Sequence, residues 1–234
     1  MSTEAEKRQR AYYSKTAEQY DEMHLRPDDE HYLALAWMLA FIDRLKCKSV
    51  LDIGSGTGRA VAYLRAHRPE LKVIGIEPSA ELRAVGHRNG IPAEQLIDGD
   101  ANHLSFQDDS FDLVCEFGVL HHLPSPRIAI SEMLRVARKG VFISDDNHFA
   151  TSWVKRALAA VGLWHAAYWL RTAGKGYRIT AGDGLAYPYS LFDDLDLLEG
   201  RCSAVHCVNS RGRGPNLRSS ATHVAAFGVK AIRD

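Results

Sequence analysis

Three glycines, each two residues from the next, stand between an apolar run and an amphipathic one. The apolar run, residues 50–53, contains Asp52 and leads directly into Gly54, Gly56 and Gly58. Glycines at such a strand-to-helix turn allow a ligand to contact the backbone close to a helix N-terminus. A tight turn without a ligand uses the same residue type, so the residues that follow must distinguish the two interpretations.

Two acids favour a ligand with a nucleoside and an amino acid end. Glu77 ends the next apolar run, 23 residues after Gly54, which is the interval at which a carboxylate reaches ribose hydroxyls in a nucleotide-binding βαβ unit. Nicotinamide-binding turns have the spacing G-x-G-x-x-G, whereas this turn has G-x-G-x-G with Asp52 two residues before the first glycine. That difference favours an amino acid end over a pyrophosphate.

With these residues the chain resembles the class I S-adenosylmethionine-dependent methyltransferases, specifically the small-molecule, type 11-like group with the motif D-x-G-x-G-x-G. The resemblance extends from about Ser49 to Ser144. It implies an α/β fold with a Rossmann-like, doubly wound, seven-stranded sheet of order 3-2-1-4-5-7-6, in which strand 7 is antiparallel. It also implies an enzyme that uses S-adenosyl-L-methionine and releases S-adenosyl-L-homocysteine.

The same resemblance implies which residues hold the cofactor. The glycine turn and Asp52 contact the methionine part, Glu77 contacts the ribose, and Asp100 accepts from the adenine amino group. Tyr20 covers the cofactor, although packing within an N-terminal helix is an equal alternative for this side chain. The implied cofactor-binding residues are Tyr20, Asp52, Gly54, Ser55, Gly56, Glu77, Pro78, Asp100, Ala101 and Phe117.

Candidate catalytic residues follow the fourth and fifth apolar runs. His121 and its neighbour His122 come after the fourth, and Asp145 and His148 after the fifth. Carboxyl ends of parallel strands meet at one edge, where open α/β sheets bind ligands. We therefore predict His121, Asp145 and His148 as catalytic. The alternative for the histidines is packing, and the alternative for Asp145 is that it caps a helix starting near Thr151. We predict no metal.

Acceptor-binding candidates lie in an aromatic segment and in a basic turn. Residues 145–200 contain most of the tryptophans, and Asp146, Tyr187 and Tyr189 are the predicted acceptor contacts there, although a helical mini-core explains the aromatic residues equally well. Residues 201–234 carry six basic residues and one acid. Arg211 and Arg213 are predicted to bind a carboxylate or phosphate of the acceptor, with a solvated loop as the alternative.

Apolar runs that alternate with amphipathic ones position these residues and predict parallel βαβ units with right-handed crossovers. A flap is expected before them, with helices over residues 4–20 and 32–45, the second capped by Asp28 or Asp29. The core elements are expected as strands at residues 49–53, 71–76, 94–97, 111–117 and 140–144, helices at 59–66, 79–88 and 127–136, and an antiparallel pair at 204–208 and 222–229.

These elements predict one domain, residues 1–234. Its expected parts are an N-terminal helical cap (1–46), a cofactor-binding core (47–144), an inserted aromatic lid (145–200) and a terminal β-hairpin (201–234). Length agrees, because 234 residues at about 150 per domain favour one decorated domain over two complete ones.

Composition excludes several classes of protein. The 234 residues are 46% apolar, with 29 basic and 29 acidic side chains, which is a globular mixture without a global field toward nucleic acid or an anionic membrane. We find neither a membrane-spanning run nor a signal peptide, and the four cysteines lack C-x-x-C spacing, so a cytoplasmic protein is expected. The chain also lacks the Asn/Asp-Pro-Pro-aromatic motif of enzymes that methylate bases.

We therefore predict methyl transfer to an oxygen, or a nitrogen, of a small-molecule acceptor, including anionic ones, in biosynthesis or secondary metabolism. Two other functions stay open at this point. A nicotinamide-dependent oxidoreductase would use the glycines and Glu77 but would leave Asp52 and Asp100 without a role. A cofactor-binding module without turnover would keep the whole pocket. The acceptor, the methylated atom and the oligomeric state stay open as well.

Overall fold

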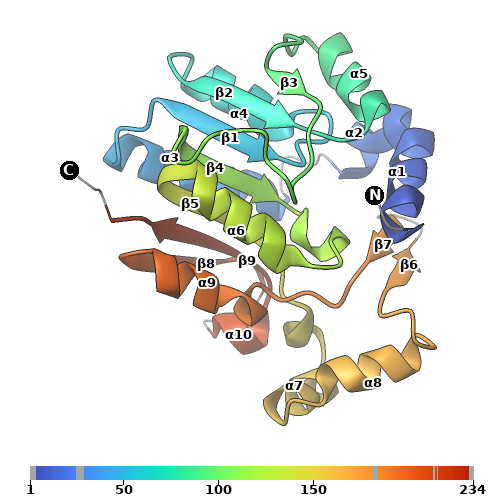
Figure 1. The fold of residues 1–234 in the computed structure, drawn as a ribbon. Helices are drawn as coiled ribbons and strands as arrows, with labels where there is room; N and C mark the ends of the chain where they lie inside the picture. Colours follow the sequence, from blue (N-terminus) through green and yellow to red (C-terminus); the bar gives the residue numbers. More distant parts are fainter. Residues whose placement is uncertain (1–3, 25–28, 181–183, 213, 215, 232–234) are drawn as a thin grey trace.

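A seven-stranded sheet forms the centre of the protein in the computed structural model, which describes residues 4–24, 29–180, 184–212, 214 and 216–231 (Figure 1). The strand order is β3-β2-β1-β4-β5-β9-β8, and β9 is antiparallel to both of its neighbours. This confirms the predicted order, with β8 and β9 as its sixth and seventh strands. The strands are β1 (Ser49–Ile53), β2 (Lys72–Ile76), β3 (Leu96–Ile97), β4 (Phe111–Phe117), β5 (Ala137–Asp146), β8 (Ala204–Gly212) and β9 (Ala221–Val229).

Helices cover both faces of this sheet. α3 (Glu30–Arg44) and α4 (Arg59–His67) share one apolar core with it, and α6 (Pro126–Val136) and α9 (Leu195–Arg201) share the other. Every residue of β4 is buried, as expected for a parallel strand between two helical layers. The arrangement brings the carboxyl ends of the parallel strands to one edge, where the predicted site residues lie.

The N-terminal segment is broken into three short elements, whereas the sequence predicted one helix over residues 4–20. They are α1 (Glu4–Thr16), a 3-10 turn η1 (Ala17–Gln19) and α2 (Tyr20–His24). Apolar residues of this segment pack on α5 (Ala80–Arg88). The break directs Tyr20 toward the glycine turn, because the Tyr20 hydroxyl lies 2.9 Å from the position that a Cβ on Gly56 would take.

Asp29 begins α3. Its carboxylate accepts hydrogen bonds from the N–H groups of His31 and Tyr32, each at 2.9 Å, which satisfies donors that the first helical turn cannot pair itself. Of the two predicted caps, Asp29 is therefore the one observed, while Asp28 lies outside the described residues.

Strand β5 is longer than the predicted 140–144 and includes both aspartates that follow. β9 pairs with it from Gly140 opposite Val229 to Asp146 opposite His223. The alternative in which Asp145 or Asp146 caps the next helix is therefore wrong, because antiparallel pairing carries the strand past them. Ser152 precedes the helix instead.

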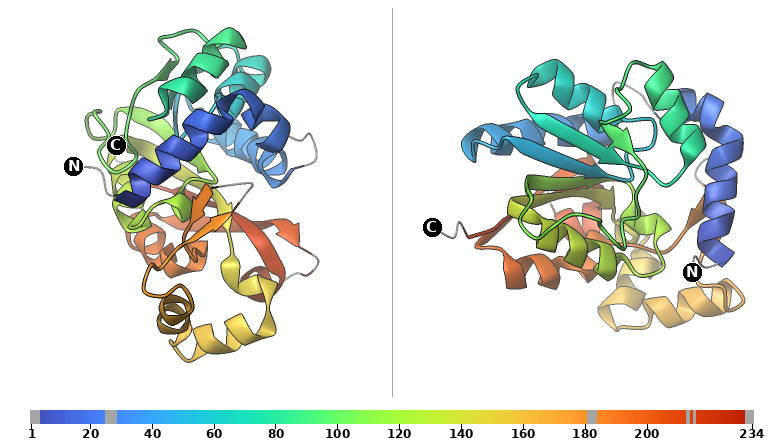
Figure 2. Two further views of the ribbon diagram at one scale, coloured as in Figure 1. Left: turned by 90° about the vertical axis from the view of Figure 1, so that its right-hand side faces the viewer. Right: turned by 45° about the horizontal axis from the view of Figure 1, so that its top comes forward.

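The insertion after β5 forms a helical hairpin and a small sheet. The hairpin packs on itself and projects from the body in both views of Figure 2, while β7 lies beside the turn after β4. None of the described helices is both long and apolar enough to cross a bilayer. The remaining elements are η2 (Leu120–His122), η3 (His148–Thr151), α7 (Trp153–Ala160), α8 (Trp164–Arg171), β6 (Arg178–Thr180), β7 (Gly184–Ala186), η4 (Leu191–Asp193) and α10 (Leu217–Ser220).

Candidate active site

The glycine turn after β1 needs glycine for two reasons. Gly54, Gly56 and Gly58 have φ angles of +63°, +57° and +89°, which residues with a side chain rarely adopt. A Cβ on Gly54 would lie 2.4 Å from the side chain of Val119, so space is missing as well. Without side chains at these positions, the backbone of the turn is accessible to a ligand at the carboxyl edge of the sheet.

Glu77 lies buried at the end of β2 with its carboxylate against this turn. The N–H of Gly56 donates to one oxygen at 3.0 Å and the N–H of Ser79 to the other at 2.8 Å. Burial raises the pKa of Glu77 to about 7, although both hydrogen bonds oppose that shift. A carboxylate so placed gains from a ligand whose hydroxyl groups donate to it.

One cavity joins the glycine turn, Glu77 and the ends of β3 and β4. It is also lined by nine residues that sequence reasoning did not assign to the cofactor, among them Gln9, Tyr13, Asn102 and His122. The predicted cofactor residues that line it are Tyr20, Gly54, Gly56, Glu77, Pro78, Asp100, Ala101 and Phe117.

A smaller cavity adjoins the first, since Tyr20, Gly54 and Phe117 line both. The other two predicted cofactor residues, Asp52 and Ser55, line this one together with Arg59. All ten predicted positions therefore surround two contiguous cavities.

The smaller cavity presents a carboxylate and a guanidinium. The Ser55 hydroxyl donates to Asp52 at 2.6 Å, while burial raises the pKa of Asp52 to about 6. Arg59 forms an ion pair with Asp29 at 3.0 Å. Opposite charges facing one space match the ammonium and carboxylate of an amino acid. With acids in the larger cavity for a nucleoside, the residues fit S-adenosylmethionine at both ends.

His122 forms hydrogen bonds at the wall of the larger cavity. Its Nδ1 lies 2.6 Å from the carbonyl oxygen of Leu185, so it carries the proton, and Nε2 lies 2.9 Å from the hydroxyl of Tyr13, which can then donate to it. His122 thus joins the N-terminal helix to the insertion. Sequence reasoning named the two adjacent histidines but assigned the chemistry to His121 alone.

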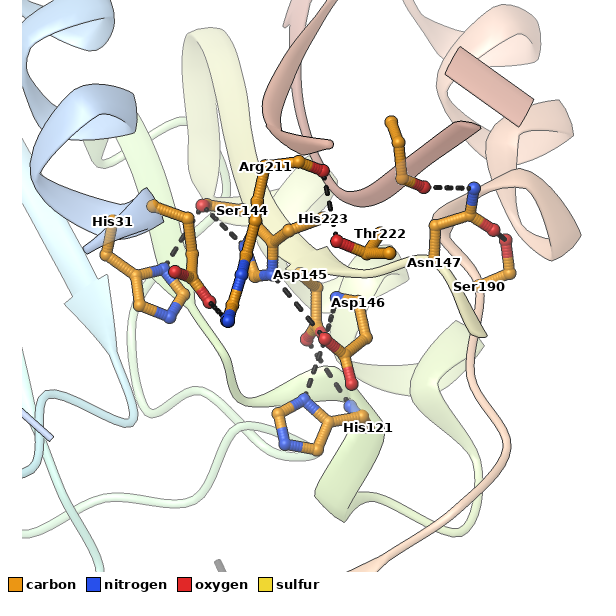
Figure 3. Close-up of polar contacts among 12 residues, drawn as sticks. His31, His121, Ser144, Asp145, Asp146, Asn147, Ser190, Arg211, Thr222 and His223 are labelled. Atoms are coloured by element: carbon orange, nitrogen blue, oxygen red, sulfur yellow. Dashed lines mark hydrogen bonds and ion pairs between the residues drawn. The ribbon is translucent and has the colours of Figure 1, made fainter. Parts of the chain in front are cut away.

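His121 forms a buried pair with Asp145. Nδ1 of His121 lies 2.7 Å from Oδ1 of Asp145, and Oδ2 accepts from the N–H of Leu120 at 2.8 Å (Figure 3). Because the carboxylate can only accept, Nδ1 carries a proton in this contact. This ring lies beside Gly118, since His121 Cε1 is 3.7 Å from the position of a Cβ there. Gly118 in turn lines the larger cavity.

Further polar side chains extend from this pair along the sheet edge (Figure 3). Ser144 Oγ lies 3.2 Å from both His31 Nδ1 and His223 Nε2, and these two imidazole rings meet edge to face at 4.7 Å. Glu116 is fully buried, and its carboxyl group accepts a hydrogen bond from the N–H of Ser144. Burial and the neighbouring Asp145 raise the pKa of Glu116 well above the usual range. No sequence motif indicated His31 or His223.

A third cavity lies at the far end of this row. His223, Asp146 and Arg211 line it, together with Glu30, Asn147, His148 and Thr222. Arg211 lies 3.1 Å from Glu30, and Asp146 lies 3.5 Å from His223. The predicted acceptor contacts Asp146 and Arg211 are thus brought together, with cationic and anionic groups on one surface.

The predicted residues His148, Tyr187 and Tyr189 differ in their surroundings. Burial, Lys155 and Arg178 lower the pKa of His148 to about 4, so it is neutral at pH 7. Tyr187 donates its N–H to the carbonyl of His121 at 2.8 Å, whereas the Tyr189 side chain is buried in the core. Arg213 lies outside the described residues.

Within the described part of the chain, no group of three or more His, Cys, Asp or Glu side chains is arranged to hold a metal ion. The acids of the site are instead satisfied by hydrogen bonds from backbone N–H groups and by His121.

Comparisons with known proteins identify the central segment. Residues 51–144 match the family model of a methyltransferase domain. A phosphatidylethanolamine N-methyltransferase from Cereibacter sphaeroides is 38% identical over 117 residues, which are 48% of this chain and 55% of that protein. A demethylmenaquinone methyltransferase from Roseiflexus is 29% identical over 61% of this chain and 58% of its own length. The chain thus spans about half the length of these relatives.

Solved structures extend the likeness in fold beyond this segment. A SAM-dependent methyltransferase from Thermotoga maritima superposes with a TM-score of 0.59 at 18% identity, covering 94% of this chain and 99% of that one. The plantazolicin methyltransferase BpumL, solved with S-adenosylhomocysteine, gives 0.54 at 16% identity and 97% coverage of both chains. At these identities the likeness shows the fold alone.

Proposed function

We propose, from the premise that this chain carries a class I S-adenosylmethionine-dependent methyltransferase domain, that it transfers a methyl group to an oxygen or nitrogen of a small molecule. The observation that carries the proposal is the pair of contiguous cavities at the carboxyl edge of the sheet. Acids that suit a nucleoside face one, and a carboxylate with a guanidinium faces the other.

The cofactor residues have distinct tasks in this proposal. Asp52 and Arg59 hold the ammonium and carboxylate ends, Glu77 accepts from ribose hydroxyls, and Asp100 accepts from the adenine amino group. When bound, S-adenosylmethionine supplies an electrophilic methyl group. Tyr20 and Phe117 line both cavities and keep water from the space between them.

His121 is the proposed general base, with Asp145 as the residue that orients it. A 2.7 Å contact fixes the proton on Nδ1 and directs the Nε2 lone pair away from the carboxylate. The imidazolium that forms on proton uptake is then stabilised by the buried carboxylate. A base of this kind favours acceptors with an ionisable hydroxyl, so oxygen is the preferred acceptor atom.

The third cavity is the proposed site for the charged end of the acceptor, whose reacting atom would extend toward His121 beside Gly118. His31 connects this cavity to the cofactor side, because this ring packs edge to face on both Phe117 and His223. Arg211 supplies the cation for an acceptor with a carboxylate or phosphate. This anionic group must compete with the Glu30 carboxylate for the Arg211 guanidinium. Asp146 and His148, which also line the cavity, then contact the neutral polar groups.

Methyl uptake from labelled S-adenosylmethionine tests this function. Three acceptors with a common ring are compared: a hydroxybenzoate, its uncharged amide and the corresponding aromatic amine. We expect labelled methyl ether from the hydroxybenzoate, with a Michaelis constant that rises in an Arg211→Gln variant only for the charged acceptor. Exclusive labelling of the amine would contradict the proposed base, and equal Michaelis constants would contradict the role of Arg211.

A further inference from the structure

Exposed apolar side chains gather in one part of the insertion. Among the described residues, nine large apolar side chains are exposed, and seven of them lie between residues 153 and 179. Trp153 is 73% exposed and Leu170 is 71% exposed, which is unusual for large side chains on a protein surface. The seven are Trp153, Val154, Val161, Leu163, Trp169, Leu170 and Ile179.

Six of these residues lie on the hairpin of α7 and α8 but outside its small core, and Ile179 lies on β6. α7 and α8 pack on each other around buried Trp164 and Tyr168, supported by Leu158 and Ala159. The hairpin has its own small core, separate from the two that flank the sheet. The hairpin projects from the body of the protein in Figures 1 and 2.

The same segment carries only positive formal charge. No Asp or Glu occurs from Asn147 to residue 182, whereas five basic residues do, in a chain whose total charge is zero. Lys155 and Arg171 line one cavity of the hairpin, and burial, with Arg178 and Arg171, lowers the pKa of Lys155. The basic residues are Lys155, Arg156, Arg171, Lys175 and Arg178.

We propose that the α7–α8 hairpin docks on an anionic phospholipid bilayer. Trp153, Trp169 and Leu170 enter the interfacial region, where tryptophan is enriched, and the flanking Lys and Arg side chains attract acidic headgroups. Each helix has eight residues and is about 12 Å long, far short of the roughly 30 Å needed to cross, so the hairpin lies in the interface.

The charges favour a bilayer over a second copy of the chain. A two-fold contact would place the same patch on both sides, so five cations would face five cations without an acid to separate them. An acidic bilayer neutralises them. The sequence expectation of no membrane rested on zero net charge and on the missing spanning run, and neither excludes a local basic and apolar surface.

Docking of this kind goes beyond the proposed methyl transfer, and its measurement requires no turnover. The surface is nevertheless connected to the third cavity. His148, which lines that cavity, contacts the rings of Trp164 and Tyr168 at centroid distances of 5.3 Å and 6.0 Å. The bilayer would therefore lie on the side of the molecule from which the hairpin extends.

Vesicle flotation of the full chain tests the proposal. We expect the protein to float with vesicles of equal parts phosphatidylcholine and phosphatidylglycerol, and to stay in solution with phosphatidylcholine alone or at high salt. A Trp169→Ala, Leu170→Ala double variant should lose flotation. A Lys175→Gln, Arg178→Gln variant should bind about 25-fold more weakly, at about fivefold per basic residue.

The matched control is Leu33→Ala with Ile128→Ala, the two large apolar side chains outside this segment that are exposed among the described residues. This variant should float like the natural protein, and all variants should keep their affinity for S-adenosylhomocysteine, which shows that they fold. Failure of the natural protein to float, or equal losses in the control, would overturn the proposal. So would a dimer in solution that the Trp169→Ala, Leu170→Ala variant abolishes without any flotation.

Discussion

Nδ1 of His121 lies 2.7 Å from Oδ1 of Asp145 across the gap between the strand ends of β4 and β5. The carboxylate is fully buried and also accepts from the N–H groups of Leu120 and His121, at 2.8 Å and 3.3 Å. It is therefore fixed before any ligand binds, and it fixes the histidine in turn. A histidine with an assigned tautomer, beside a cofactor cavity, is prepared to take a proton.

Asp145→Asn should lower methyl transfer by about 10²- to 10⁴-fold, because the amide can donate to Nδ1 and stabilise the wrong tautomer. His121→Gln should do the same. Affinity for S-adenosylhomocysteine should change less than about twofold in both, since neither side chain lines the cofactor cavities. Single-turnover rates and calorimetry measure the two effects.

The control for this pair is His67→Gln, an exposed histidine at the end of α4. Its rate should equal that of the natural protein. Full activity in Asp145→Asn across the pH range would remove the base from the account and favour an acceptor that reacts without proton transfer.

Cofactor affinity should rise with pH because of Glu77. Its pKa is about 7 in the folded chain without ligand, against 4.5 ordinarily. Hydroxyl donors favour the ionised carboxylate, so affinity for S-adenosylhomocysteine should increase as pH rises through about 7 and then level off. Glu77→Gln should flatten this profile and weaken binding about 10-fold at pH 8. Titration calorimetry from pH 6 to 8.5, in steps of about half a pH unit, measures the dissociation constant of S-adenosylhomocysteine at each pH.

The stability of the ligand-free chain should have the opposite trend. A carboxyl whose pKa is higher in the folded state contributes stability below pH 4.5 that is lost as pH rises through about 7. Glu94→Gln, an exposed control, should change neither profile. A pH-independent affinity in the natural protein would show that Glu77 does not titrate in the relevant range.

Gly56→Ala should abolish cofactor binding while Gly90→Ala does not. Both positions have positive φ, +57° and +90°, so each substitution should cost about 1–2 kcal/mol of stability. Only at Gly56 does the new Cβ meet a neighbour, the Tyr20 hydroxyl at 2.9 Å, because a Cβ on Gly90 has nothing within 4 Å. Thermal unfolding without S-adenosylhomocysteine measures the loss of stability that both variants share. The rise in unfolding temperature on adding the ligand shows which variant still binds it. Equal ligand-induced stabilisation in the two variants would contradict the placement of the cofactor.

Arg59→Met should weaken binding of S-adenosylhomocysteine about 10-fold or more and leave 5′-methylthioadenosine unaffected, because only the former has a carboxylate to pair with the guanidinium. Competition between the two ligands in one titration gives the ratio directly. Equal losses for both would mean that the variant disturbs the fold, for instance through the lost ion pair with Asp29.

The cofactor half of the site could be predicted from sequence because local rules govern it. Glycine spacing, the acid 23 residues later and the alternation of runs are properties of one βαβ unit after another, and the observed strand order follows them. Glu77 lies where its interval from Gly54 placed it, against the turn.

The acceptor half depends on contacts between distant segments, which no local pattern encodes. His31 and Ser144 meet across 113 positions, and pairing with β9 extends β5 through Asp145 and Asp146. Sequence reasoning also could not decide which of two adjacent histidines faces the cavity. That depends on Leu185 in the insertion, whose carbonyl fixes His122.

Titration calorimetry of the purified protein with S-adenosylhomocysteine, and with NAD in parallel, tests the central claim most directly. The account predicts micromolar binding of S-adenosylhomocysteine, lost in Gly56→Ala, and no heat with NAD. Binding of NAD alone would contradict it, because Asp52 and Asp100 would then have no ligand to contact and the domain would serve a different chemistry.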